Sequence, residues 1–326
     1  MKKTRDTSFD VMKGIGILLV ITDHFFSWNN PVLGRIINSF HMPLFFLIAG
    51  YFSKSFTTTE EAMLNIKKFA KRLLPAFIFT QVAIILWTVL MAITKSEGWN
   101  PVIRESLSLI WADPHGPHTP WGRLYLGVIW FLVALFFAKS ALLLLSKFKA
   151  YAIPISIALA WGAILLHKVF PYSIWCISVG LTALPFVTIG WWFRTHAIPK
   201  WLVIVCIGCW ITALFFSHLG MYDIDWGCFP LDLLGACGGT LVIYMISKFI
   251  CGKLKATAKV FAILGIWSLG IMCFHNLETH CHLGNHVMAL IPVSLPVWGK
   301  YLFRYLLTIA MAAIATKLPV LKRIFS

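Results

Sequence analysis

A lysine and a histidine lie eleven residues apart in the first apolar segment, DVMKGIGILLVITDHFF. On a helix, Lys13 and His24 would lie about 20° apart on one face, with roughly 16 Å between them along the axis. A neutral imidazole takes a proton from a hydroxyl near pH 7, so His24 is a candidate general base. A histidine that only hydrogen-bonds between helices fits the same position. The spacing therefore indicates a catalytic or a structural histidine on the same face as a cation.

Two carboxylates lie beside these residues. Asp10 precedes Lys13 by three residues, so the two are expected to pair near the cytoplasmic end of the helix. The same spacing also fits an ion pair without a catalytic role at the membrane surface, in which the lysine side chain extends toward water. Asp23 adjoins His24 but points about 100° around the helix, so it is not expected to orient the ring directly.

A second histidine lies at the start of FHMPLFFLIAGYF, residues 40–52. His41 falls in the outer half of the membrane, as His24 does, so it is expected to reach the same site. Gly50 beside Ala49 permits a close approach of another helix. The segment is short and contains Pro43 and Gly50, which predicts a broken or re-entrant span.

A cationic face precedes the third apolar segment in KKFAKRLLP, residues 67–75. Lys68, Lys71 and Arg72 follow one another at i, i+3 and i+4, so a helix presents them together. The face suits the phosphates of an anionic nucleotide donor. It equally suits a cytoplasmic anchor of the membrane span.

The last polar group lies in SLGIMCFHNLETHCHLGNH, residues 268–286. His275 and Glu278 share a helix face and are candidates for orienting a substrate. His280, His282 and His286 follow, but their spacing matches no strong zinc pattern. We therefore expect no metal.

The composition decides which elements hold these residues. The chain of 326 residues is 59% hydrophobic and 12% charged, with a mean hydropathy of +0.82. These values predict an all-α integral membrane protein, a single domain over residues 1–326 with no separate soluble domain. The net charge of +16 does not indicate nucleic acid, because the basic residues cluster in short loops between spans. The predicted spans are 9–28, 36–53, 73–94, 124–145, 151–169, 172–193, 200–218, 228–250, 260–282 and 298–316.

The loop charges predict the orientation. With the N-terminus inside, the inner segments hold 19 of the 28 lysines and arginines, and the outer segments and span ends hold seven. The excess recurs in every inner loop, which favours about ten transmembrane helices with both termini cytoplasmic. Two outer loops, 95–123 and the acidic 219–232, are long enough to cover a binding site.

With these elements in order, the chain resembles acyltransferase family 3, the integral membrane O-acyltransferases, and most closely the branch similar to fucose 4-O-acetylases. Six segments carry the resemblance from one end of the chain to the other: DVMKGIGILLVITDH (10–24), FHMPLFFLIAGYF (40–52), KRLLP (71–75), WFLVALF (130–136), LPFVTIGWWFR (184–194) and LGIWSLGIMCFH (264–275). Many members have arginine where this chain has Lys13. Phe69 stands at the earlier position of a common R-x-x-R pattern that ends at Arg72.

The resemblance implies transfer of an acyl group, usually acetyl, from cytoplasmic acyl-CoA to a hydroxyl of a glycan or a lipid-linked saccharide. His24 is then the catalytic residue. The donor is expected to bind Arg72, Lys71, Lys68 and Lys13, and the orienting residues are His41, Asp10, His275 and Glu278. The expected location is the bacterial plasma membrane, where lipid surrounds the protein; self-association is left open.

A second class of function fits the same residues. In a secondary transporter, the intramembrane His, Lys and Asp side chains would relay protons. The absence of repeat symmetry in the sequence argues against it. A scaffold or flippase is a third reading with little in the sequence to support it.

Overall fold

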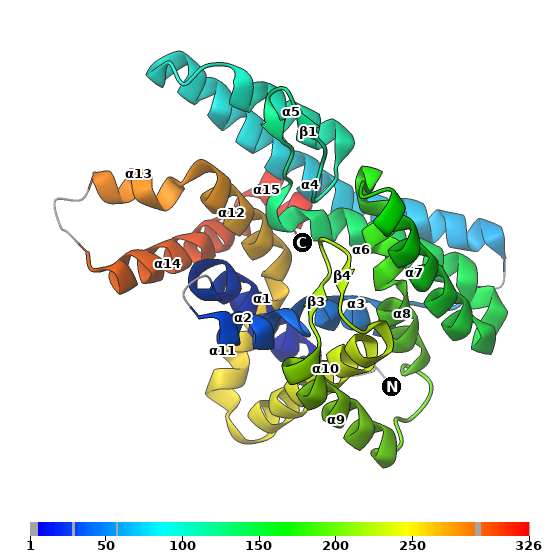
Figure 1. Cartoon of the computed structure of the whole chain (residues 1–326). Helices are drawn as coiled ribbons and strands as arrows, with labels where there is room; N and C mark the ends of the chain where they lie inside the picture. Colours follow the sequence, from blue (N-terminus) through cyan, green and yellow to red (C-terminus); the bar gives the residue numbers. More distant parts are fainter. Residues whose placement is uncertain (1–5, 28–29, 57, 291–294, 326) are drawn as a thin grey trace.

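The computed structural model describes residues 6–27, 30–56, 58–290 and 295–325. Lys2, Lys3 and Arg5, three of the predicted cytoplasmic cations, lie outside these residues. The described chain is almost entirely helical, as predicted, with two short β-hairpins (Figure 1). The longer helices are α1 (Thr7–Phe26), α4 (Thr59–Lys95), α6 (Trp130–Leu145), α7 (Ala152–Val169), α8 (Ile177–Trp192), α9 (Lys200–Phe216), α10 (Phe229–Lys253) and α14 (Val297–Ala315).

Two of the predicted spans are each divided between two helices. The second span consists of α2 (Pro31–Asn38) and α3 (His41–Tyr51), with the break at Ser39 and Phe40. The ninth consists of α11 (Lys255–Ile266) and α12 (Ser268–Cys281), which meet at 65°.

The number of spans is only partly supported. Within the described residues, six helical stretches are long and apolar enough to cross a membrane, or seven if α11 and α12 form one span. The long stretch Gly127–Val169 contains both α6 and α7. These are two separate helices, because Lys149 between them has non-helical backbone angles. α1 carries three charged residues, Asp10, Lys13 and Asp23, and α9 has 17 residues, so neither is counted. The ten spans and their orientation therefore remain predictions.

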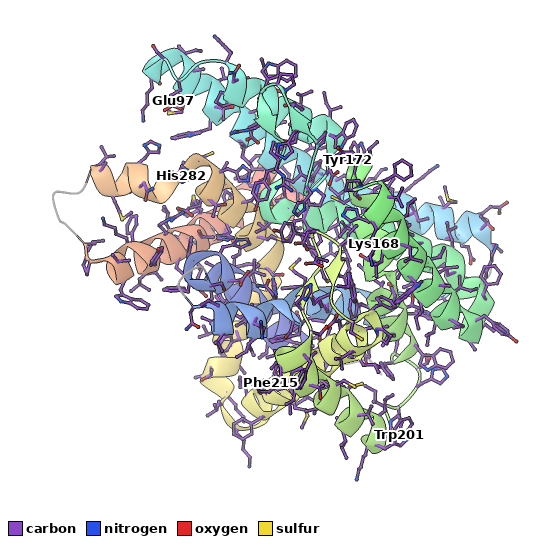
Figure 2. The ribbon with its side chains drawn as sticks, viewed as in Figure 1. Glu97, Lys168, Tyr172, Trp201, Phe215 and His282 are labelled. Carbon is purple, nitrogen blue, oxygen red and sulfur yellow. The ribbon has the colours of Figure 1, made fainter. Side chains whose placement is uncertain are left out.

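The outward faces of the helices suit a lipid environment. Trp201 and Phe215 point away from the bundle on α9, with 65% and 72% of their surfaces exposed (Figure 2). Exposed apolar side chains on many helices form a surface that water would not favour. The protein is accordingly a multi-pass membrane protein.

Small residues bring the helices around the site into close contact. A Cβ atom on Gly14 of α1 would collide with the backbone oxygen of Phe261 in α11, and one on Gly265 would collide with that of Asp10. Gly50 of α3 and Gly190 of α8 make the same kind of crossing, against the oxygens of Val187 and Leu47. The predicted role of Gly50 in close helix packing is thus seen directly.

We expect Gly50→Val to lower the thermal stability of the detergent-solubilised protein by several degrees. A side chain there must separate two backbones, and overpacking of this kind costs about 1–3 kcal/mol. The matched control is Gly162→Val on α7, where an added Cβ meets nothing within 4 Å. Equal melting temperatures for the two variants would contradict the crossing.

The remaining elements lie at the outer ends of the helices in the predicted orientation. They are α5 (Asn100–Trp111), the β1–β2 hairpin (His118–Thr119 with Gly122–Arg123), the β3–β4 hairpin (Leu219–Gly220 with Asp225–Trp226) and α13 (Leu283–Ala289). α15 (Pro319–Phe325) and the short 3-10 turns η2 (Gly127–Ile129), η3 (Ser146–Tyr151) and η4 (Ile174–Cys176) complete the described chain. The β3–β4 hairpin crosses in front of the central helices in Figure 1.

Candidate active site

One face of α1 lines two cavities in succession. Lys13 and Ile17 line a cavity of about 730 Å³, and Asp23 and His24 line one of about 540 Å³; in the predicted orientation these are the inner cavity and the outer cavity. Val20 lines both. The face that carries Lys13 and His24 in the sequence is therefore the wall of both cavities, which lie end to end along the helix.

His24 and His41 both line the outer cavity. His41 Nδ1 lies 2.8 Å from the backbone oxygen of Ile37. Because a carbonyl oxygen only accepts, Nδ1 carries the proton, and Nε2 of the neutral ring is left as an acceptor. Asp23 lines the same cavity and accepts hydrogen bonds from Ser27 Oγ at 2.5 Å and Asn38 Nδ2 at 2.9 Å. The structure thus brings these two imidazoles and a carboxylate together in one cavity.

The ring of His275 packs against the ring of His24. The two ring centroids are 5.3 Å apart, and the ring of Phe25 packs edge-on against His275 at the same distance. His275 is fully buried and lines neither cavity. Within the described residues, neither of its ring nitrogens has a hydrogen-bond partner. His275 thus contacts the ring of His24 from outside both cavities, and its orienting role stays a prediction.

Of the two predicted outer loops, 219–232 lines the outer cavity, whereas no described residue of 95–123 does. The β3–β4 hairpin contributes Tyr222, Asp223 and Asp225, and the loop before α6 contributes Tyr125. His218 Nε2 lies 3.0 Å from Asp225. Desolvation raises the pKa of Asp223 above its usual value, which indicates a carboxylate partly withdrawn from water. Aromatic and carboxylate side chains together suit a ligand with several hydroxyl groups.

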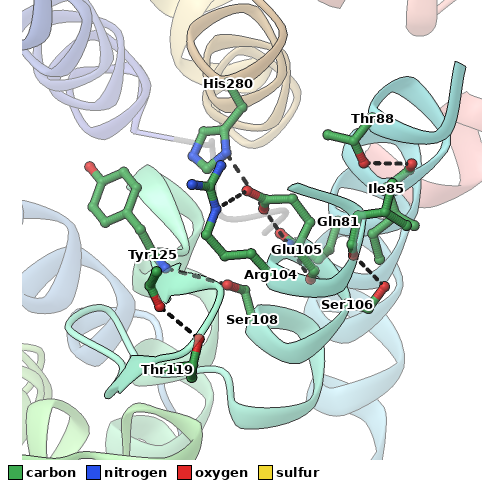
Figure 3. A network of polar contacts seen from close by, with 12 residues as sticks. Gln81, Ile85, Thr88, Arg104, Glu105, Ser106, Ser108, Thr119, Tyr125 and His280 are labelled. Carbon is green, nitrogen blue, oxygen red and sulfur yellow. Dashed lines mark hydrogen bonds and ion pairs between the residues drawn. The ribbon is translucent and has the colours of Figure 1, made fainter. Parts of the chain in front are cut away.

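A buried polar cluster fixes the wall that bears Tyr125 (Figure 3). Glu105 of α5 accepts a hydrogen bond from Gln81 of α4 at 3.2 Å, and His280 of α12 lies 3.9 Å from it. The ring of Tyr125 stacks on His280 at 5.6 Å. Burial raises the pKa of Glu105 above its usual value. The cluster joins α5 to α4 and α12, and through His280 it contacts Tyr125, which lines the outer cavity.

The inner cavity is lined by four cations, two of them predicted. Asp10 pairs with Lys13 at 2.8 Å, as the spacing predicts, and Arg72 lines the same cavity. Lys139 and Arg194 join them from α6 and from the end of α8. Lys139 Nζ lies 4.3 Å from the ring centre of Phe69. Sequence reasoning missed both, although a lysine in the middle of an apolar helix is itself a signal of function.

The other predicted residues lie elsewhere. Lys68 and Lys71 are exposed and do not line the inner cavity. Glu278 is fully buried and faces α14, where Arg304 donates two hydrogen bonds to it at 2.6 and 3.0 Å. In the described part of the chain, no three His, Cys, Asp or Glu side chains gather as metal ligands would.

Comparisons with known proteins show the family of the chain. A family model described as an acyltransferase domain, that of acyltransferase family 3, matches residues 6–319. The chain therefore belongs to acyltransferase family 3, a family of membrane acyltransferases. It is 28% identical over 234 residues to Nodulation protein NolL of Mesorhizobium japonicum, a match that covers 66% of this chain and 56% of that protein. No solved structure matches the chain.

Proposed function

We propose that the protein transfers an acyl group, most simply acetyl, from acyl-CoA to a hydroxyl of a glycan or lipid-linked saccharide at the bacterial plasma membrane. The observation that carries the proposal is the position of His24. It lies in a cavity with polar and aromatic walls, and that cavity adjoins a second one lined by cations. Membership of an acyltransferase family supplies the reaction class.

The inner cavity suits the donor. Coenzyme A carries several phosphate charges, and cations bind phosphate through charge-assisted hydrogen bonds. Lys13, Arg72, Lys139 and Arg194 supply four positive charges around a space of about 730 Å³. The distance of roughly 16 Å from Lys13 to His24 along the helix is one that an extended pantetheine arm covers for the most part.

The outer cavity suits the acceptor. Its volume of about 540 Å³ lies in the range of small-ligand sites. Asp223 and Asp225 offer acceptors for sugar hydroxyls, and Tyr125 and Tyr222 offer faces for the apolar side of a ring. A hydroxyl held between these walls would lie beside His24.

His24 would act as general base. It takes the proton of the acceptor hydroxyl while the oxygen attacks the thioester carbonyl and forms a tetrahedral oxyanion. When the intermediate collapses, the bond between carbon and sulfur breaks and the thiolate of CoA leaves. The imidazolium returns its proton to that thiolate, so the enzyme ends as it began. Asp23, one residue away, stabilises the positive charge of the imidazolium while it exists.

The experiment is a comparison of cell-surface glycans with and without the protein by mass spectrometry. We expect the glycans to lose one acyl increment when the protein is absent. Vesicles that hold the purified protein serve as the control for the transporter reading. Solute uptake without consumption of acyl-CoA would favour a transporter and contradict the proposal.

A further inference from the structure

The two cavities meet at three apolar side chains. Val20 of α1, Met42 of α3 and Met272 of α12 each line both cavities, and no other described residue does so. All three are buried, with exposed fractions of 3%, 9% and 6%. We call these three residues the throat. Its apolar character contrasts with the cations on its inner side and with the histidines and carboxylates on its outer side.

The throat lies one helical turn from the proposed base. Val20 precedes His24 by four residues on α1, so their Cα atoms are about 6 Å apart along the axis. In the proposed reaction, the donor approaches from the inner cavity with its acyl group in front. The carbonyl that His24 serves must therefore come to rest at the throat or just beyond it.

We propose that Val20, Met42 and Met272 select the acyl group and restrict transfer to short chains such as acetyl and propionyl. This inference rests on the proposed function. A short acyl group finds apolar contacts among the three side chains while its carbonyl faces His24. A longer one must extend into the outer cavity, where it would displace the acceptor and cover Asp23 and His41 without satisfying them.

Two properties of the throat support selection rather than a closed wall. Methionine side chains are unbranched and flexible, so Met42 and Met272 can move aside for a thin pantetheine arm. Val20 is stiff and its place is fixed by the helix. The three side chains come from three different helices, so the width of the throat depends on how α1, α3 and α12 pack.

The test uses inverted membrane vesicles from cells that make the protein together with its natural acceptor. Acetyl-, propionyl-, butyryl- and octanoyl-CoA are supplied separately, and the mass increment on the vesicle glycans is measured. We expect the wild-type protein to transfer acetyl and propionyl and to discriminate against the longer chains. Met42→Ala and Met272→Ala are each expected to raise the ratio of butyryl to acetyl transfer about tenfold, the effect of one or two methylene groups in a pocket.

Two further variants and a binding measurement distinguish a change in acyl selection from a loss of folding. Met12→Ala is the matched control, because Met12 lies on α1, is 3% exposed and lines neither cavity; it should leave the ratio unchanged. Val20→Phe should reduce propionyl transfer more than acetyl transfer. Binding of CoA to each purified variant, measured by calorimetry, reports whether the inner cavity is intact.

The outcomes separate the two proposals. Transfer of octanoyl at the acetyl rate by the wild-type protein overturns selection at the throat and leaves the acyltransferase function standing. An unchanged ratio of butyryl to acetyl transfer in Met42→Ala and Met272→Ala, with CoA binding retained, also overturns selection at the throat. No transfer of any acyl group by the wild-type protein overturns the proposed function, and with it this inference.

Discussion

Cells that carry His24→Ala are expected to lose most acyl transfer to their surface glycans, with a rate roughly 10²–10⁴-fold below that of the wild-type protein. This is the usual contribution of a general base, and among the described histidines of the outer cavity His24 is the one that α1 carries, four residues from Val20. His41 and His218 are the other imidazoles there: His41 Nδ1 donates to the backbone oxygen of Ile37, and His218 Nε2 lies 3.0 Å from Asp225.

The measurement is the transfer of labelled acetyl from acetyl-CoA in inverted vesicles, together with CoA binding by the purified variant. We expect binding of CoA to be retained, because His24 lies outside the inner cavity. His167→Ala is the matched control: His167 also lies in an apolar helix, is also partly exposed and lines neither cavity. Wild-type transfer by His24→Ala would remove this residue from the reaction.

The residues that share one face of a single helix could be predicted reliably from the sequence. The common face of Lys13 and His24 follows from the pitch of a helix, and the ion pair of Lys13 with Asp10 follows from the same pitch. The break in the second span was also predicted, from Pro43 and Gly50, although it falls earlier, at Ser39 and Phe40. Such features depend on residues that are close together in the chain, so they can be predicted from the sequence.

Features that depend on packing between distant segments could not be predicted in the same way. Lys139 and Arg194 join Arg72 only because α6 and the end of α8 pack around the inner cavity. Lys68 and Lys71 share a helix face with Arg72 by spacing, yet only Arg72 reaches the cavity. The throat needs three helices in register, and nothing in the sequence around Val20, Met42 or Met272 marks it.

The second prediction follows from which cations line the inner cavity: Arg72 and Lys139 do, and Lys68 and Lys71 do not. Arg72→Gln and Lys139→Met are each expected to weaken binding of CoA about 10- to 100-fold, because a hydrogen bond to a charged group contributes about 1.5–3 kcal/mol. The two changes together should weaken it further. Calorimetry with CoA measures the affinity, and the salt dependence of binding should fall as each charge is removed.

The matched controls are Lys68→Gln and Lys71→Gln, which remove the same charge from the same helix as Arg72 but outside the inner cavity. We expect them to change CoA affinity by less than about threefold, because their side chains do not line the inner cavity and an exposed charge away from a bound ligand contributes little. Equal losses for Lys71→Gln and Arg72→Gln would mean that the phosphates bind at the exposed helix face instead. The Arg72 and Lys139 variants should also raise KM for acetyl-CoA and leave kcat nearly unchanged, since their charges lie on the inner side of the throat and away from the reacting carbonyl. His24→Ala should do the reverse, and the opposite signatures of the two cavities separate donor binding from chemistry.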